Sequence, residues 1–132
     1  MRYYLDTNTL IFVLLNQLDE IDNNIIAILD DYSNSFYASS VAMRELILLH
    51  KNGKLEKHKY KSYKDIFNTI DSLGIEIVPV QRSNLFAYAE LIPVVEHKDP
   101  NDHIIIAQSI SDKIPIISSD RKFKLYEGTF SK

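Results

Sequence analysis

Short apolar runs alternate along the chain with longer segments whose apolar residues recur at the spacing of a helix. Each short run ends in an acid, small polar residues or proline, which is typical of a buried strand followed by a turn. The pattern predicts strands at residues 3–5, 36–38, 75–79 and 114–117, and helices at 9–15, 21–31, 41–50, 63–73, 83–92 and from 100 to about 108. Alternating strands and helices favour a three-layer α/β/α fold with a central parallel sheet of four to five strands.

Residues that cap helices support several of these boundaries. Ser39 and Ser40 supply an N-cap for the third predicted helix, Gly74 closes the fourth, and Ser83 caps the fifth. Asp99 followed by Pro100 is an N-cap with the favoured first-turn proline. The helix after Asp99 is therefore expected to begin at Pro100.

Length and composition predict one domain over residues 1–132 with a core of its own. The chain has no cysteine, which excludes a disulfide framework and a thiolate metal site. No apolar run approaches the roughly 18 residues that cross a bilayer, and Asp6 interrupts the segment where a signal peptide would need an apolar core. We therefore expect a cytoplasmic protein without a membrane span. The net charge of −3 gives no general attraction to nucleic acid, so any basic surface must be local.

Four acids fall where the predicted fold brings separate segments together. Asp6 and Asp120 each follow a strand, Glu45 lies in the helix after the second strand, and Asp102 lies in the first turn of the helix that begins at Pro100. All four start from the carboxyl edge of the sheet, where ligands bind in open α/β folds. Carboxylate oxygens without cysteine or a histidine pair suit a hard cation such as Mg²⁺, or Mn²⁺ in its place. Such an ion binds phosphate oxygens and lowers the pKa of a bound water.

Each acid also has a purely structural explanation. The apolar face of the third predicted helix is marked by Val41, Ala42, Leu48 and Leu49, and Glu45 lies on it. The structural explanations for Glu45 are a salt bridge in the neighbourhood of Arg44 or a position at the rim of the core. Asp99 is explained well as a helix cap. Asp102 falls at the third helical position, where an acid can complete a capping box. These alternatives stay open for each acid taken singly.

Two segments are rich in basic residues. Residues 51–64 hold six lysines and one glutamate, which usually indicates a solvated surface and less often a nucleic-acid contact. Residues 113–132 hold five basic residues and two acids, and Arg121, Lys122 and Lys124 follow Asp120 directly. The second segment is a candidate for neutralising phosphates beside the acids.

Four motifs in chain order resemble the PIN domain family, and most closely its VapC-type toxins from bacterial toxin–antitoxin pairs. They are Tyr4-Leu5-Asp6-Thr7-Asn8, Arg44-Glu45-Leu46, Asp99-Pro100-Asn101-Asp102 followed after His103 by Ile-Ile-Ile-Ala-Gln, and Ser118-Ser119-Asp120. The resemblance covers nearly the whole chain. It implies an α/β/α fold and Mg²⁺-dependent hydrolysis of RNA that leaves 5′-phosphate and 3′-hydroxyl ends.

The resemblance also implies roles for particular residues and partners. Asp6, Glu45, Asp102 and Asp120 would be the catalytic and metal-binding acids, and Glu45 would help to deprotonate the nucleophile. Supporting roles fall to Thr7, Asp99 and Ser118, and RNA contacts to Arg121, Lys122 and Lys124. The implied partners are the RNA substrate, an antitoxin protein and a second copy of the chain.

Two other functions were weighed against this one. A phosphatase of the haloacid dehalogenase type also begins with a strand-end aspartate, but it needs a second aspartate where this chain has Asn8. A degenerate PIN-like fold that binds RNA or protein without cutting is the second alternative, and the presence of all four acids argues against it. Metal-dependent RNA cleavage that is lost on changing Asp102 separates the enzyme from the binding module.

Overall fold

A parallel sheet forms the centre of the molecule. In the computed structural model, residues 1–56, 58–92 and 99–118 are described, and they contain four strands in the order β3-β2-β1-β4. Their bounds are β1 (Arg2–Leu5), β2 (Ser35–Ser39), β3 (Ile75–Val78) and β4 (Ile116–Ile117). All neighbouring pairs are parallel, as the alternation of elements predicted. The register pairs Leu5 with both Ala38 and Ile117, so the strands end together at one carboxyl edge.

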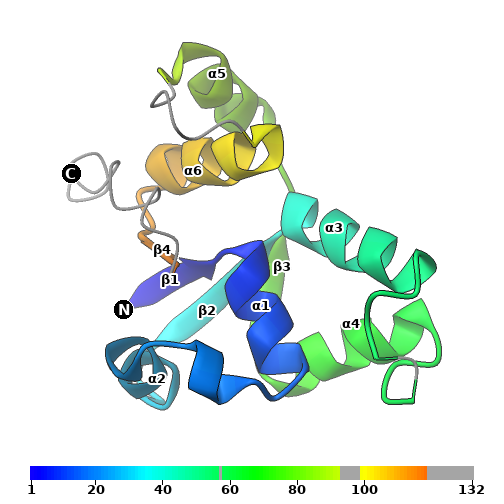
Figure 1. The fold of residues 1–132 in the computed structure, drawn as a ribbon. Coiled ribbons are helices and arrows are strands. Elements are labelled where there is room, and N and C mark those ends of the chain that lie inside the picture. Colours follow the sequence, from blue (N-terminus) through cyan, green and yellow to red (C-terminus); the bar gives the residue numbers. More distant parts are fainter. Residues whose placement is uncertain (57, 93–98, 119–132) are drawn as a thin grey trace.

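Helices cover both faces of this sheet. Their bounds are α1 (Thr7–Leu14), the 3₁₀ turn η1 (Leu18–Glu20), α2 (Asn23–Leu29), α3 (Ser40–Lys51), α4 (Tyr63–Ser72), α5 (Arg82–Glu90) and α6 (Pro100–Asp112). Figure 1 shows α5 and α6 on one side of the sheet and α1, α2 and α4 on the other, with α3 beside the carboxyl end of β2. The three-layer α/β/α prediction is confirmed.

The core lies mainly between the sheet and the layer formed by α1, α3 and α4. Leu5, Leu10, Leu46, Ile66 and Ile70 are at most 1% exposed and belong to one apolar cluster. Burial of large aliphatic side chains of this kind contributes about 1.5–3 kcal/mol each. No helix among the described residues is both long and apolar enough to cross a membrane.

Three sequence expectations are corrected at the level of elements. The first helix begins at Thr7 and not at residue 9, because the side chain of Asp6 caps it. Helix α5 begins at Arg82 after Gln81, and Ser83 is not its cap. The stripe of α3 that faces the core is formed by Ala42, Met43 and Leu46, whereas Leu48, which was expected on the apolar face, is 49% exposed.

The lysine-rich segment is also more ordered than a solvated linker. Leu55 and Tyr60 are 2% and 1% exposed. The Tyr60 hydroxyl donates to the backbone carbonyl of Leu14 at 2.5 Å, and Lys59 Nζ donates to the same oxygen at 3.0 Å. Tyr60 and Lys59 therefore fasten the segment to the end of α1. No periodic pattern in the sequence predicted this contact.

Candidate active site

Asp6 is a buried carboxylate at the carboxyl end of the central strand β1. It is 2% exposed, and both of its oxygens accept hydrogen bonds. Oδ1 accepts from the backbone N–H of Thr9 at 2.9 Å, which caps α1, and Oδ2 accepts from the Ser118 hydroxyl at 2.6 Å. Ser118 follows β4, so the two neighbouring strands hold this carboxylate between them. The orientation of Asp6 is fixed before any ligand binds.

Helix α6 carries Asp102 and is docked to its neighbours by side-chain hydrogen bonds. Gln108 Nε2 donates to the carbonyl of Val78 at 3.2 Å. Asp112 accepts from the Tyr4 hydroxyl at 2.6 Å and from Asn84 Nδ2 at 3.0 Å. These contacts tie α6 to β1, β3 and α5 and so set the position of its first turn.

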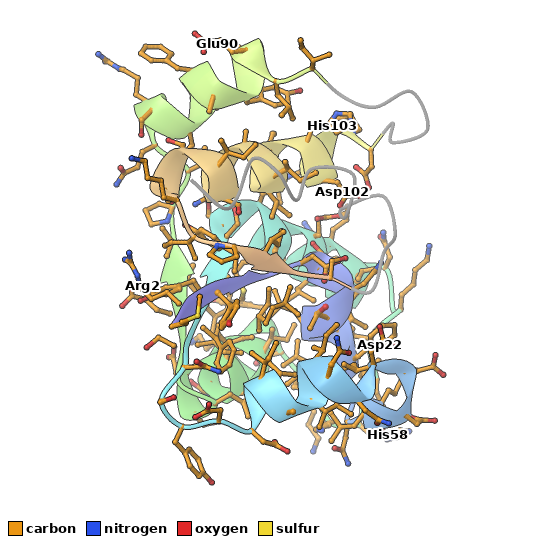
Figure 2. All side chains as sticks on the ribbon, turned by 90° about the vertical axis from the view of Figure 1, so that its left-hand side faces the viewer. Arg2, Asp22, His58, Glu90, Asp102 and His103 are labelled. Atoms are coloured by element: carbon orange, nitrogen blue, oxygen red, sulfur yellow. The ribbon has the colours of Figure 1, made fainter. Side chains whose placement is uncertain are left out.

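The first turn of α6 begins with a capped end. The carboxylate of Asp99 accepts from the backbone N–H of Asn101 at 3.0 Å, so Asp99 is the N-cap and Pro100 the first helical residue, as predicted. In Figure 2, Asp102 lies on the side of α6 that faces the sheet, whereas His103 lies on the side toward α5. Asp102 is therefore turned toward Asp6.

Glu45 reaches the same place from α3. Its Oε1 accepts from the Thr7 hydroxyl at 2.7 Å, which joins α3 to the first residue of α1. Glu45 is half-buried, and Arg44 beside it is exposed. Of the structural alternatives, the half-buried position fits the rim of the core, and a partner of Glu45 among the described residues is the Thr7 hydroxyl.

A pocket of about 310 Å³ opens between these elements. It is bounded by the amino ends of α1 and α6 and by one side of α3. Its lining consists of Asp6, Thr7, Asn8, Ile11, Glu45, Leu48, Leu49, Asp99, Asn101 and Asp102. Four carboxylates from three separate helices or their caps thus face one hollow at the carboxyl edge of the sheet.

The negative charges of the acids in this pocket make ionisation of their neighbours less favourable. Burial raises the pKa of the Asp6 carboxyl, the hydrogen bonds from Ser118 and Thr9 oppose that rise, and the charge of Asp102 adds to it. Burial also raises the pKa of Glu45, against the bond from Thr7, and the charges of Asp99 and Asp102 raise it further. A proton or a cation bound among these groups would relieve the repulsion.

Comparison with known proteins places this arrangement in a family. The family model of the PIN domain matches residues 3–128, which is nearly the whole chain. The chain belongs to the PIN domain family. No significant match was found among curated proteins.

Solved structures agree on the fold of this PIN domain. The crystal structure of VapBC2 from Rickettsia felis, bound to a DNA fragment from their promoter, matches with a TM-score of 0.64. The match covers 95% of this chain and 92% of that one, at 21% sequence identity. At that identity the likeness establishes the fold alone.

The donor set of the PIN domain pocket fits a hard divalent cation. All of its acidic ligands are carboxylates, and Mg²⁺ in proteins typically takes one or two of these while keeping several waters. Within residues 1–56, 58–92 and 99–118, no group of three or more acids or histidines is arranged to hold a metal ion. An ion at Asp6 and Asp102 would thus complete its coordination with water, with substrate oxygens or with Asp120.

Some predicted site residues lie outside the described part of the PIN domain. These are Asp120 and the RNA-contact candidates Arg121, Lys122 and Lys124. Of the other acids, the structure brings Asp6, Glu45, Asp99 and Asp102 to one pocket. The supporting candidates Thr7 and Ser118 each donate a hydrogen bond to one of these carboxylates.

Sequence reasoning did not assign a role to Asn101 or Asn8. A hydrogen bond from the Asn101 side chain lowers the pKa of Glu45, and both asparagines line the pocket. The sequence offered one indication of their importance. Asn8 lies in the same motif as Asp6, and Asn101 lies in the same motif as Asp99 and Asp102. The long-range bond between Thr7 and Glu45, 38 residues apart, left no local signal.

Proposed function

We propose that this PIN domain protein is a Mg²⁺-dependent endoribonuclease and the toxin of a type II toxin–antitoxin pair. The observation that carries the proposal is the set of carboxylates of Asp6, Glu45 and Asp102 around one pocket at the carboxyl edge of the sheet. A pocket of this charge repels a polyanion unless a cation bridges the two. Hydrolysis of a phosphodiester is the chemistry that uses such a bridge.

Each acid has a distinct task in this proposal. Asp6, held by Thr9 and Ser118, and Asp102, held by the docking of α6, would bind Mg²⁺, with Asp120 as a further ligand implied by the family pattern. When bound, Mg²⁺ supplies Lewis-acid activation of water and neutralises phosphate oxygens. Glu45 would accept the proton of the attacking water, and its raised pKa supports this role because it makes the carboxylate a better base. Thr7 keeps the Glu45 side chain oriented through its hydroxyl.

The competing proposal is a PIN domain that binds RNA or protein without cutting. The two differ in what they require of the pocket. A binding module gains nothing from several carboxylates that repel one another around one pocket, since such repulsion costs stability. The charge of Asp102 raises the pKa of both Asp6 and Glu45, and this arrangement therefore favours the enzyme.

Partners follow from the toxin proposal. An antitoxin segment would insert a basic side chain among Asp6, Asp102 and Glu45 and form charge-assisted hydrogen bonds in place of the cation. The VapBC2 structure supports a protein partner for this fold. A complex whose partner leaves these carboxylates open would contradict this mode of inhibition. The predicted homodimer is tested independently by light scattering of the purified chain.

The test of the enzymatic proposal is an RNA cleavage assay with control of the metal. Purified protein is incubated with a 5′-labelled single-stranded RNA of mixed sequence in Mg²⁺, in Mn²⁺ and in EDTA. We expect cleavage with either cation, none in EDTA, and products that carry 5′-phosphate and 3′-hydroxyl ends. Cleavage that proceeds unchanged in EDTA would contradict the metal-dependent mechanism, and binding without cleavage in Mg²⁺ would favour the binding module.

A further inference from the structure

One of the two basic segments of this acidic chain lies almost wholly within the described residues. Residues 51–64, here called the basic segment, hold six lysines and one glutamate, a net +5, so the rest of the chain carries −8 of the total −3. Lys51, Lys54, Lys61 and Lys64 are all exposed. Within the described ranges, the side-chain ammonium groups of these four lysines form no hydrogen bond or ion pair. Cations without internal partners are available to an external anion.

The basic segment is held in a defined place. Tyr60 and Lys59 fasten it to the Leu14 carbonyl, and His50 Nε2 lies 2.9 Å from the Tyr60 carbonyl. Leu55 is buried in the core cluster below it. Leu55 and Tyr60 anchor the segment. Its lysines therefore lose less conformational entropy on binding a ligand than lysines on a free linker would lose.

An exposed stripe of α3 connects the acidic pocket with the basic segment. Arg44, Leu48 and Lys51 are four and three residues apart, so they share one face of the helix, and all three are exposed. Leu48 also lines the pocket that holds Glu45. Over the six residues from Glu45 to Lys51 the helix rises about 9 Å. A bound strand therefore has a short path from the pocket to the lysines.

An exposed aromatic ring lies within the same basic region. Tyr63, the first residue of α4, is 54% exposed and stands between Lys61 and Lys64 in the chain. Its ring meets Phe67 edge-on at 6.4 Å between centroids, which supports it from one side. Stacking of bases on aromatic rings beside cations is the usual way in which proteins bind single-stranded nucleic acid.

Asp102 and His58, which lies in the basic segment, are on the same side of the view in Figure 2. Both are labelled on the right of the molecule, whereas Arg2 is labelled on the left. We infer that the exposed stripe of α3, the basic segment and Tyr63 together form the surface along which single-stranded RNA reaches the acidic pocket. This inference rests on the proposed ribonuclease function and names its substrate path. The path differs from the Arg121, Lys122 and Lys124 contacts expected from the sequence.

The test measures the salt dependence of RNA binding when cleavage is prevented. All proteins carry Asp102→Asn, and the probe is a fluorescein-labelled single-stranded RNA of mixed sequence. Adding Lys54→Ala and Lys61→Ala should lower the slope of log affinity against log salt by about 1.4, or about 0.7 for each lost phosphate contact. The charge-matched control is Arg2→Ala with Arg82→Ala, two exposed arginines on β1 and α5, and it should leave the slope unchanged. Thermal melts confirm that every variant is folded.

A substitution of Tyr63 provides a second test, which measures the contribution of base stacking to RNA affinity separately from that of charge. Tyr63→Ala should weaken RNA binding by about fivefold or more at every salt concentration while leaving the slope intact, because it removes stacking and no charge. Tyr32→Ala, which removes a fully exposed ring outside the surface, should have no effect.

The outcomes separate this inference from the proposed function. If the lysine variants lose slope but the wild type cleaves no RNA, the binding surface stands and the ribonuclease proposal fails. If the wild type cleaves RNA and the lysine slope is unchanged, the surface is wrong and the ribonuclease proposal stands. Loss of binding to duplex DNA or to a protein partner without loss of RNA binding would also overturn the inference.

Discussion

At the scale of single residues, the buried and mutually repelling carboxylates of the candidate site lower the stability of the folded protein. Asp6 is almost fully buried, accepts hydrogen bonds from Thr9 and Ser118, and faces the charge of Asp102. A buried carboxylate without a cationic partner disfavours folding. Sites that carry such costs are where function is expected to oppose stability.

The first prediction at this scale concerns Asp102→Asn in the absence of metal. The amide keeps the shape and removes the charge that raises the pKa of Asp6 and Glu45. We expect the metal-free variant to be as stable as the wild type or more stable by about 1 kcal/mol, and to gain less from added Mg²⁺. Thermal melts in EDTA and in Mg²⁺ measure both effects. If Asp102 serves only to complete the cap of α6, the variant will instead be less stable in EDTA.

The second prediction uses the raised pKa of Glu45. Because the folded-state pKa is above the unfolded one, the folded protein takes up this proton first as the pH falls. The charged form costs stability at pH values above the folded pKa, and that cost disappears as the pH falls toward the unfolded pKa. In EDTA, Glu45→Gln should therefore be more stable than the wild type at about pH 8, and the advantage should shrink with acidification. Urea unfolding of both proteins across this range measures the difference. An advantage that grows with acidification would show that the pKa is lowered.

The sequence predicted that Asp6, Glu45 and Asp102 lie close together, as the pocket shows, but it left their hydrogen-bond partners open. Glu45 could be placed on a stripe with Val41 and Leu49, yet the stripe alone did not show whether it was paired. Its partner, Thr7, lies in another helix, and the two meet only because α1 and α3 start from the same edge of the sheet. Contacts of this kind depend on tertiary packing and leave no periodic signal.

At the scale of elements, the sequence predicted which segments form strands and which form helices. It did not predict which side of α3 faces the core or which side chain anchors the basic segment. Short apolar runs gave the strands because parallel strands are buried on both faces. The core-facing side of α3 was misjudged because the helix is apolar on most sides, so periodicity did not separate Leu46 from Leu48. Tyr60 was passed over because its anchoring bond to Leu14 spans 46 residues.

The third prediction tests this anchor. Tyr60→Phe keeps the buried ring and removes the hydroxyl that donates to the Leu14 carbonyl. Lys59 still donates to that oxygen, so the loss should be about 1 kcal/mol, and the melting temperature should fall by about 3 °C. Tyr32→Phe is the matched control, since the Tyr32 ring is fully exposed, and it should change stability by less than about 0.5 kcal/mol. Equal melting temperatures for the two variants would mean that the anchor does not stabilise the fold.

At the scale of the whole molecule, the net charge of −3 conceals an uneven distribution of acidic and basic residues. The described acids Asp6, Glu45, Asp99 and Asp102 meet at one pocket, and α3 runs from that pocket to Lys51, the first residue of the basic segment. The fold makes this possible because parallel strands deliver all their following helices to one edge. Sequence alone located both charge groups, but only the structure shows that α3 joins them.

The central claim is that the carboxylates in the pocket perform RNA cleavage, and two amide substitutions on one helix test it most directly. Cleavage of single-stranded RNA in Mg²⁺ is compared at saturating substrate between wild type, Asp102→Asn and Asp99→Asn. The account predicts that Asp102→Asn loses about a hundredfold or more in rate. Asp99→Asn should stay within about tenfold of the wild type, because asparagine caps helices as well as aspartate. An Asp102→Asn protein that is folded, binds the RNA and cuts it at the wild-type rate would contradict the account.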